Sequence, residues 1–163
     1  MFQLKAVPSA SADLLYDELA QQLTGLLAGE RDMIANAANS AALIFNSLPD
    51  LNWAGFYFLQ GDTLVLGPFQ GKPACVRIAM GKGVCGTAVQ QRKTQLVTDV
   101  NDFPGHIACD VASRSELVVP LIHDGRTIGV LDLDSPTPAR FTTTDQAGVE
   151  RLAQIFVAGS SFA

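Results

Sequence analysis

Three cysteines, Cys75, Cys85 and Cys109, are the residues of this chain best suited to redox chemistry. Their odd number, in a chain whose first residues do not look like a signal peptide, argues against a disulfide scaffold. Separations of ten and twenty-four residues do not match the short loops that bring zinc ligands together, and only His106 and His123 could assist. Two interpretations stay open. The cysteines are either small buried apolar residues or a redox set, in which one thiolate attacks and another resolves the product.

A pair of acids, Asp132 and Asp134, lies in a segment whose pattern predicts a buried strand. Side chains two residues apart on a strand share a face, and Ile128 and Val130 are expected on that face too. Buried carboxylates are unfavourable unless something satisfies them. Fraying of the strand before Pro136 would take Asp134 to water, but this explanation fits Asp132 less well.

A third acid, Glu116, depends on the register of the hairpin predicted between residues 115 and 133. A three-residue loop with a left-handed Gly125 and a bulge sets Glu116 opposite Asp132, whereas a two-residue Asp-Gly turn sets it opposite Leu133 on the other face. We favour the first register as a hypothesis, because it gathers three carboxylates in one pocket. Such a cluster can bind a cation or an ammonium group, or share a proton through raised pKa values. Calcium suits the ligand type, although no segment resembles a calcium loop.

Hydrophobic periodicity, together with glycine and proline, predicts the elements that position these residues. Helical spacing of apolar residues predicts helices over 11–28 and 30–47, a short one over 83–91 and a closing one over 144–157. Strand patterns cover 52–59, 63–67, 76–78, 95–97, 115–122 and 126–133, and a long loop from residue 99 leads into Cys109. This order predicts an α+β fold with a central, largely antiparallel six-stranded sheet and helices packed on one side.

The composition excludes several classes of protein. The 163 residues suffice for one domain, and 48% hydrophobic against 17% charged residues is the reverse of a disordered chain. The net charge of -5, without any cluster of lysine and arginine, argues against a nucleic-acid binder. No apolar run approaches the roughly 20 residues that a membrane helix requires. We therefore expect a cytoplasmic protein.

Residues 38–157 resemble a GAF domain, and specifically the free methionine-(R)-sulfoxide reductase subfamily. The strand and helix pattern after Gly129 is only a weak signal for function. The three cysteines with their neighbours, together with Trp53 and the three acids, are far more specific. The segments that carry the resemblance are NWAGFY (52–57), LGPFQG (66–71), GKGVCGTA (81–88), FPGHIACD (103–110), SELVVPL (115–121) and IGVLDLDS (128–135).

The resemblance implies a role for each matching position. Cys109 matches a cysteine that attacks the sulfoxide and becomes a sulfenic acid, Cys75 one that resolves it as a disulfide, and Cys85 a third that takes part in recycling. Which of Cys75 and Cys85 resolves first stays open. The remaining positions match the two sides of a substrate pocket, its polar side at Glu116, Asp132 and Asp134 and its apolar side at Trp53 and Tyr57.

The resemblance also implies what surrounds the reaction. It predicts a single GAF domain over 1–163, with N-terminal helices over about 11–47, the sheet and pocket over about 52–134 and the C-terminal helix over about 144–157. The substrate is free methionine-R-sulfoxide, and thioredoxin, with thioredoxin reductase and NADPH, is the external reductant. Neither a bound cofactor nor a metal is expected, and the family commonly forms homodimers.

The chemistry of the residues agrees with this resemblance. A cysteine attacks sulfur as a thiolate, and a protonated acid can deliver a proton to the departing oxygen while ionised acids hold the ammonium group. His106 near Cys109 is a candidate for lowering the pKa of that thiol, although a structural role is the simpler interpretation. Trp53 and Tyr57 share a strand face, where such residues are more often core than pocket. The alternatives are a non-catalytic GAF sensor of a small ligand and a thiol redox sensor.

Overall fold

The computed structural model describes residues 11–107 and 109–162 of the chain. The elements follow one another in this order: α1 (Ala12–Leu26), α2 (Met33–Ser47), β1 (Trp53–Gln60), β2 (Thr63–Gly71), β3 (Arg77–Ala79), α3 (Gly83–Gln91), β4 (Gln95–Val97), a 3-10 turn (Val100–Asp102), β5 (Ser115–His123), β6 (Arg126–Ser135) and α4 (Thr143–Gly159). Most bounds lie within three residues of the sequence prediction. The main exception is β2, which continues through Pro68 to Gly71 because a register shift against β1 accommodates the proline.

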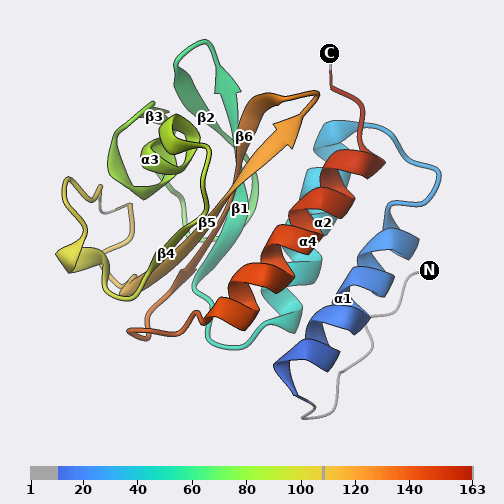
Figure 1. Cartoon of the computed structure of the whole chain (residues 1–163), viewed down its shortest axis with the longest axis horizontal. Helices are drawn as coiled ribbons and strands as arrows, with labels where there is room; N and C mark the ends of the chain where they lie inside the picture. The colour runs from blue at the N-terminus through green and yellow to red at the C-terminus, as the bar shows by residue number, and fades with distance from the viewer. Residues whose placement is uncertain (1–10, 108, 163) are drawn as a thin grey trace.

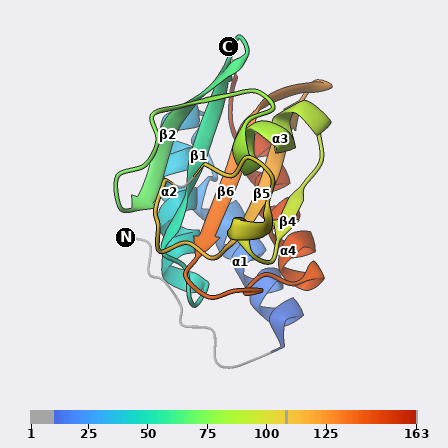
Figure 2. The ribbon, with the colours of Figure 1, turned by 90° about the vertical axis from the view of Figure 1, so that its left-hand side faces the viewer.

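One sheet organises the molecule, with the strand order β3-β2-β1-β6-β5-β4. Every neighbouring pair of strands is antiparallel. Helices α1, α2 and α4 lie along one face of the sheet, and the short α3 lies on the other (Figure 1). The α+β class and the six-stranded antiparallel sheet are thus confirmed. The expectation that the helices pack on one side holds for the three long ones, whereas α3 and the loop between β4 and β5 cover the opposite face (Figure 2).

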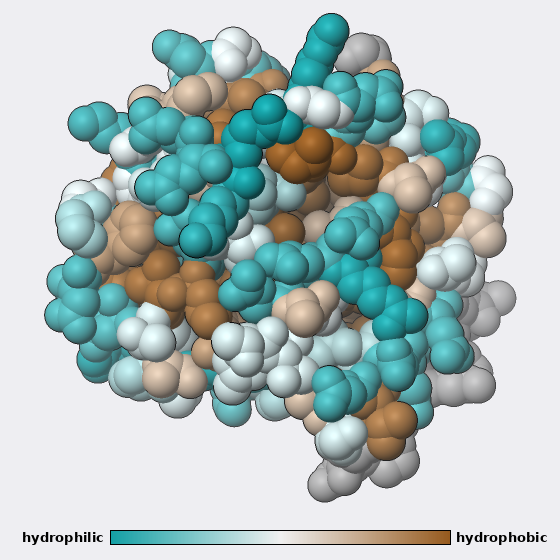
Figure 3. Space-filling view, viewed as in Figure 1, coloured by the Kyte–Doolittle hydropathy of each residue, from teal (hydrophilic) through white to brown (hydrophobic). Residues whose placement is uncertain are grey.

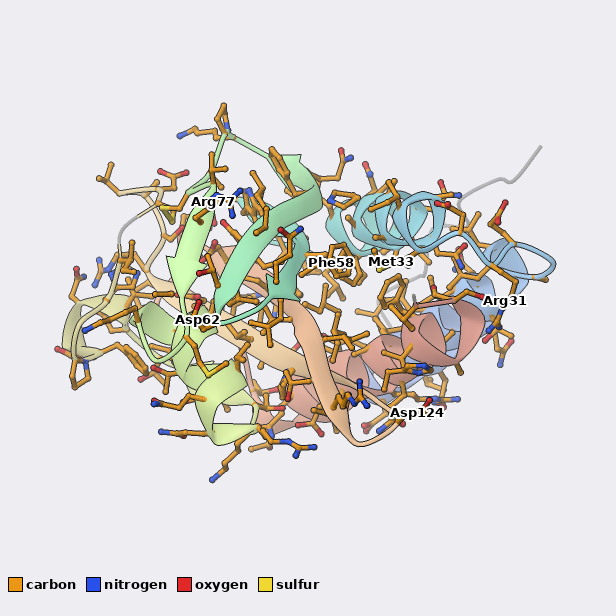
Figure 4. The ribbon with its side chains drawn as sticks, turned by 90° about the horizontal axis from the view of Figure 1, so that it is seen from above. Arg31, Met33, Phe58, Asp62, Arg77 and Asp124 are labelled. Atoms are coloured by element: carbon orange, nitrogen blue, oxygen red, sulfur yellow. A yellow bond between two sulfur atoms is a disulfide. The ribbon has the colours of Figure 1, made fainter. Side chains whose placement is uncertain are left out.

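The two faces of the sheet carry two different cores. The larger core joins α1, α2 and α4 to the sheet, and its fully buried members include Leu19, Phe56 and Phe156. Phe58 of β1 projects toward this side and lies near Met33 of α2 (Figure 4). The smaller core lies under α3 and contains Val84 and Val130, together with several of the candidate site residues. The sequence alternation therefore divides the strands between a structural face and a face that holds the candidate site.

The β5–β6 hairpin differs from the prediction at its turn. Asp124 and Gly125 both have positive φ, at 46° and 72°, which is the two-residue turn that the prediction set aside. His123 pairs with Arg126, and a register shift follows between Leu121 and Ile122. The turn alone would have placed the acids on opposite faces of the sheet.

The register shift is a β-bulge, and its extra residue is Ile128. This one extra residue returns Glu116 to the sheet face of Asp132 and Asp134. Glu116 consequently pairs with Asp134 rather than with Asp132, so the predicted partner was wrong although the predicted face was right. Ile128 itself packs against the helical layer and does not share the face of Asp132, which corrects a second expectation. The bulge therefore decides that three carboxylates point the same way.

Gly148 in α4 offers a test of how tightly α1 is packed against α4. A Cβ added there would lie 2.2 Å from the ring of buried Tyr16, whose hydroxyl donates a 2.9 Å hydrogen bond to Asp145. The ring cannot move without losing this bond. We expect Gly148→Ala to lower the free energy of unfolding by about 1–3 kcal/mol, as overpacking does, despite the better helix propensity of alanine. Urea unfolding measures the change.

Gly25 in α1 is the matched control, because a Cβ there would have no neighbour within 4 Å. Gly25→Ala should leave stability unchanged or raise it by up to about 1 kcal/mol. Equal effects of the two substitutions would show that α1 and α4 are not closely packed at this point.

The surface turned to the viewer in Figure 3 carries hydrophobic residues in separate patches among hydrophilic ones. Within the described ranges, none of the helices has the length and hydrophobicity to cross a membrane.

Candidate active site

A disulfide joins two of the predicted redox cysteines. Cys75, in the loop between β2 and β3, is bonded to Cys109, in the loop before β5, across a Cα–Cα distance of 5.4 Å. Both residues are half-buried, whereas Cys85 is free and buried in α3. The bond brings together segments 34 residues apart in sequence, and it leaves Cys85 outside the bonded pair.

The segment after Cys109 is held by residues that the sequence analysis did not single out. Asn52 donates its side-chain amide to Ser113 Oγ (3.0 Å) and to Asp110 Oδ2 (3.3 Å). Asp110 also accepts from the backbone N–H of Ala112 at 2.9 Å and forms an ion pair with Lys72 at 3.5 Å. The Ala112 bond is the largest of the effects that lower the pKa of Asp110. An Asp whose side chain can accept a hydrogen bond from the backbone two residues on is a sequence signal for such a turn.

The three acids lie together on the sheet face below α3. Glu116 and Asp132 are 6% and 5% exposed, and Asp134 is half-buried. Cys85 lies over them, with its Sγ 3.9 Å from Glu116 Oε1. One ligating atom each from Cys85, Glu116 and Asp132 lie within 4.8 Å of one another. The gathering of the three predicted carboxylates is therefore a feature of the structure, and fraying does not bring Asp132 to water.

Burial dominates the electrostatics of this cluster. Desolvation raises the pKa of Asp132 to about 7, and it raises the pKa of Glu116 and of Asp134 well above the usual range, with the charge of Asp132 adding to both. In the described part of the chain, no lysine or arginine forms an ion pair with any of the three. The nearest basic group is His106, whose Nε2 lies 3.9 Å from Glu116 Oε2. The cluster therefore retains a proton at neutral pH, and it can serve as a proton donor.

These raised pKa values predict how stability depends on pH. Between the unfolded pKa, near 4, and the folded pKa of about 7, the native Asp132 binds more protons than the unfolded chain does. Its contribution to stability is thus fully present below pH 4 and is lost as pH rises from about 4 to about 7, by up to about 1.4 kcal/mol per pH unit. Burial lowers the pKa of His106, and this shift makes stability rise with pH, opposite to the effect of Asp132. The effect of Asp132 is therefore measured as a difference between wild type and a variant.

Asp132→Asn isolates the carboxyl effect. We expect the free energy of unfolding of Asp132→Asn, measured in urea with EDTA present, to gain on wild type as the pH is raised from 5.5 to 7.5. Parallel pH dependences of the two proteins would mean that Asp132 does not carry a raised pKa.

Two aromatic side chains of β1 lie beside the acids on the same sheet, and Trp53 pairs directly with Asp134 of β6. Trp53 and Tyr57 stack at a centroid distance of 5.8 Å, and Trp53 also stacks on Phe69 at 5.3 Å. The Tyr57 hydroxyl donates to the backbone oxygen of Cys75 at 2.9 Å, and Trp53 Nε1 donates to that of Lys72 at 3.2 Å. These residues thus line a cavity and also fix the segment that carries Cys75.

A single cavity connects these groups. Its lining includes His106 and Ile107 as well as seven of the eight predicted site residues: Trp53, Tyr57, Cys85, Cys109, Glu116, Asp132 and Asp134. Cys75, the eighth, reaches the site through its bond to Cys109. His106, for which a structural role was the simpler interpretation, lies beside Glu116. His123 lies outside this lining, beside Asp124 in the hairpin turn.

Comparisons with known proteins agree with this geometry. The family model of the GAF domain matches residues 30–157. The free methionine-R-sulfoxide reductase of Escherichia coli (strain K12) is 54% identical over 137 residues, which are 84% of this chain and 83% of that protein. The structure of free methionine-R-sulfoxide reductase from Neisseria meningitidis, in complex with its substrate, superposes with a TM-score of 0.93 at 45% identity, covering 98% of this chain and 95% of that one.

A third relative carries a different name. A putative GAF sensor protein from Burkholderia vietnamiensis is 61% identical, with a TM-score of 0.90 over 93% of this chain and 96% of that one. The two solved structures share this fold over nearly their whole length. The chain belongs to the GAF domain family and, within it, to the group of free methionine-R-sulfoxide reductases.

Proposed function

We propose that this protein reduces free L-methionine-(R)-sulfoxide to L-methionine. The observation that carries the proposal is one cavity lined both by the half-buried Cys109 and by a cluster of acids with raised pKa values. The likeness to reductases whose structures hold the substrate supports the same conclusion. The reaction needs both parts of this cavity, since a soft nucleophile must attack sulfur while the oxygen gains a proton.

The first half-reaction takes place at Cys109. Its thiolate attacks the sulfoxide sulfur, the sulfur–oxygen bond of the substrate breaks, and the oxygen is transferred to give methionine and a Cys109 sulfenic acid. A protonated carboxyl of the cluster supplies the proton that the departing oxygen requires. An ionised carboxylate holds the substrate ammonium group, while Trp53 and Tyr57 receive the methyl end. Amide substitutions of Glu116, Asp132 and Asp134 distinguish the proton donor from the ammonium ligand.

The second half-reaction restores the thiols. The Cys75 thiol condenses with the sulfenic acid, releasing water and forming the Cys75–Cys109 disulfide. A protein dithiol, for which we propose thioredoxin, then reduces this bond by exchange and leaves as its own disulfide. Cys85 matches a cysteine with a part in recycling, and its burial means that such a part requires the first turn of α3 to move. We further propose a homodimeric, cytoplasmic enzyme that needs no bound cofactor.

A coupled assay tests the proposal. Thioredoxin, thioredoxin reductase and NADPH are supplied with each diastereomer of free methionine sulfoxide, and the loss of NADPH is followed. Consumption with the R form alone is the expected result. Silence with both diastereomers, in protein shown to contain reducible Cys75–Cys109 disulfide, would favour a GAF sensor instead.

Cys75→Ser tests the resolving step. Without a strong disulfide reductant, the variant should form about one methionine per active site and then stop, because the sulfenic acid has lost its partner. Quenched-flow quantification of methionine gives this number. Cys85→Ser is the control, and peptide mapping of its oxidised form should recover the Cys75–Cys109 bond. Multiple turnover of Cys75→Ser at the wild-type rate would remove Cys75 from the mechanism.

A further inference from the structure

The inner end of the cavity holds a set of side chains that the reductase cycle does not fully use. Cys85 from α3, Glu116 from β5 and Asp132 from β6 present one sulfur and two oxygen atoms within 4.8 Å of one another, and all three residues are buried. The Cys75–Cys109 bond already supplies the attacking and resolving pair, so neither of these two steps uses the Cys85 sulfur where it lies beside the acids.

An unsatisfied polar atom marks the same point. Asp132 is 95% buried, and its Oδ1 has no hydrogen-bond partner among the described residues. An orphan carboxylate oxygen at this depth is unfavourable, and a bound cation would satisfy it. The adjoining cavity measures about 30 Å³, above the roughly 10–15 Å³ that one water-sized species requires. An ion fits this space.

We propose that Cys85, Glu116 and Asp132 form a binding site for a thiophilic divalent cation of the zinc class. Sulfur with carboxylate oxygen is a zinc donor set, whereas calcium and magnesium bind oxygen alone. Tetrahedral geometry with ordinary zinc bond lengths places a sulfur and an oxygen ligand about 3.6 Å apart. The observed 3.9 Å between Cys85 Sγ and Glu116 Oε1 is about 0.3 Å longer, within the reach of a side-chain adjustment.

His106 borders this site, since its Nε2 lies 3.9 Å from the second oxygen of Glu116. Binding involves no redox change: the Cys85 thiol and any protonated carboxyl of Glu116 or Asp132 release their protons to solvent, and the three groups bind the ion as a thiolate and carboxylates. If the acids hold the sulfoxide substrate as proposed above, the ion and the substrate exclude each other, and the ion acts as an inhibitor. That consequence rests on the proposed function, but metal binding itself does not.

Cadmium titration of the oxidised protein tests the site directly. With the Cys75–Cys109 bond intact, Cys85 is the one free thiol among the three cysteines, so a thiolate-to-cadmium ultraviolet band can only come from it. We expect one Cd²⁺ per chain with this band, and displacement by Zn²⁺. Cys85→Ala should abolish the band and weaken binding by more than the roughly 10- to 100-fold that loss of an outer-shell partner costs.

Glu116→Gln and Asp132→Asn provide a second arm, because they keep the thiol and remove one oxygen ligand each. Both should weaken Cd²⁺ binding at least about 10-fold, and circular dichroism establishes that each variant is folded. Asp102→Asn, an exposed acid of the 3-10 turn, is the control and should bind like wild type. Absence of the band in wild type would overturn the proposal, and so would wild-type affinity in either carboxylate variant. This test needs no turnover, so failure of the reductase assay would leave it standing.

Discussion

Cys109→Ser is expected to lose at least about a thousandfold in turnover of methionine-R-sulfoxide, because the hydroxyl is a far weaker nucleophile toward sulfur and cannot form a sulfenic acid. Serine differs from cysteine by one atom, so the loop anchored by Asn52 and Asp110 should keep its conformation. The coupled NADPH assay measures the loss. Quantification of sulfenic acid with a trapping reagent should find none in the variant after one equivalent of substrate.

Binding of the substrate should survive this change, which separates chemistry from folding. Trp53 is the only tryptophan of the chain and lines the cavity, so its fluorescence reports occupancy. Cys109→Ser should retain a saturable fluorescence change with the R diastereomer. If Cys109→Ser still turned over repeatedly, the nucleophile would have to be another cysteine, and Cys85 would be the first to examine.

Amide substitutions of the buried acids are expected to produce the second largest effect. Glu116→Gln, Asp132→Asn and Asp134→Asn should each reduce the rate on the order of a hundredfold or more, the usual contribution of a proton donor or of a charge held in place for the substrate. Each substitution preserves shape while it removes the titrating proton and the charge. No lysine or arginine among the described residues pairs with these acids, so the substitutions break no ion pair with either residue type, and Glu116→Gln changes only the 3.9 Å contact with His106.

The pH dependence of the rate should distinguish the roles of the acids. Loss of the proton donor should remove the decline of kcat at high pH, because this decline reports the ionisation of a carboxyl whose pKa is raised by burial. Loss of the ammonium ligand should instead raise KM. Glu150→Gln is the matched control, since Glu150 accepts hydrogen bonds from Thr94 and Gln146 outside this cavity. Wild-type rates in all three site variants would show that the carboxylate face is structural.

The sequence by itself determined the elements and much of the site's membership. Helices and strands follow from periodicities of 3.6 and 2 residues, which are local, so the bounds of α3 and β4 were predicted without error. The shared face of Asp132 and Asp134 follows from the same period. The roles of Cys75, Cys85 and Cys109 came from family resemblance, because their spacing alone did not distinguish a redox set from small buried apolar residues.

The tertiary structure decided what depends on contacts between distant segments. The bulge at Ile128 set Glu116 against Asp134, and an alternating pattern cannot reveal such an insertion because one extra residue reverses every side chain beyond it. The pairing of Cys75 with Cys109, rather than with Cys85, depends on how two loops pack, and no local period encodes that. Packing between distant segments also places Cys85 over two buried acids, and it places α3 on the face of the sheet opposite to the other helices. Local periodicity determines the face of its own helix or strand on which a side chain lies. Which faces of different elements come into contact is determined only when the chain folds and brings distant segments together.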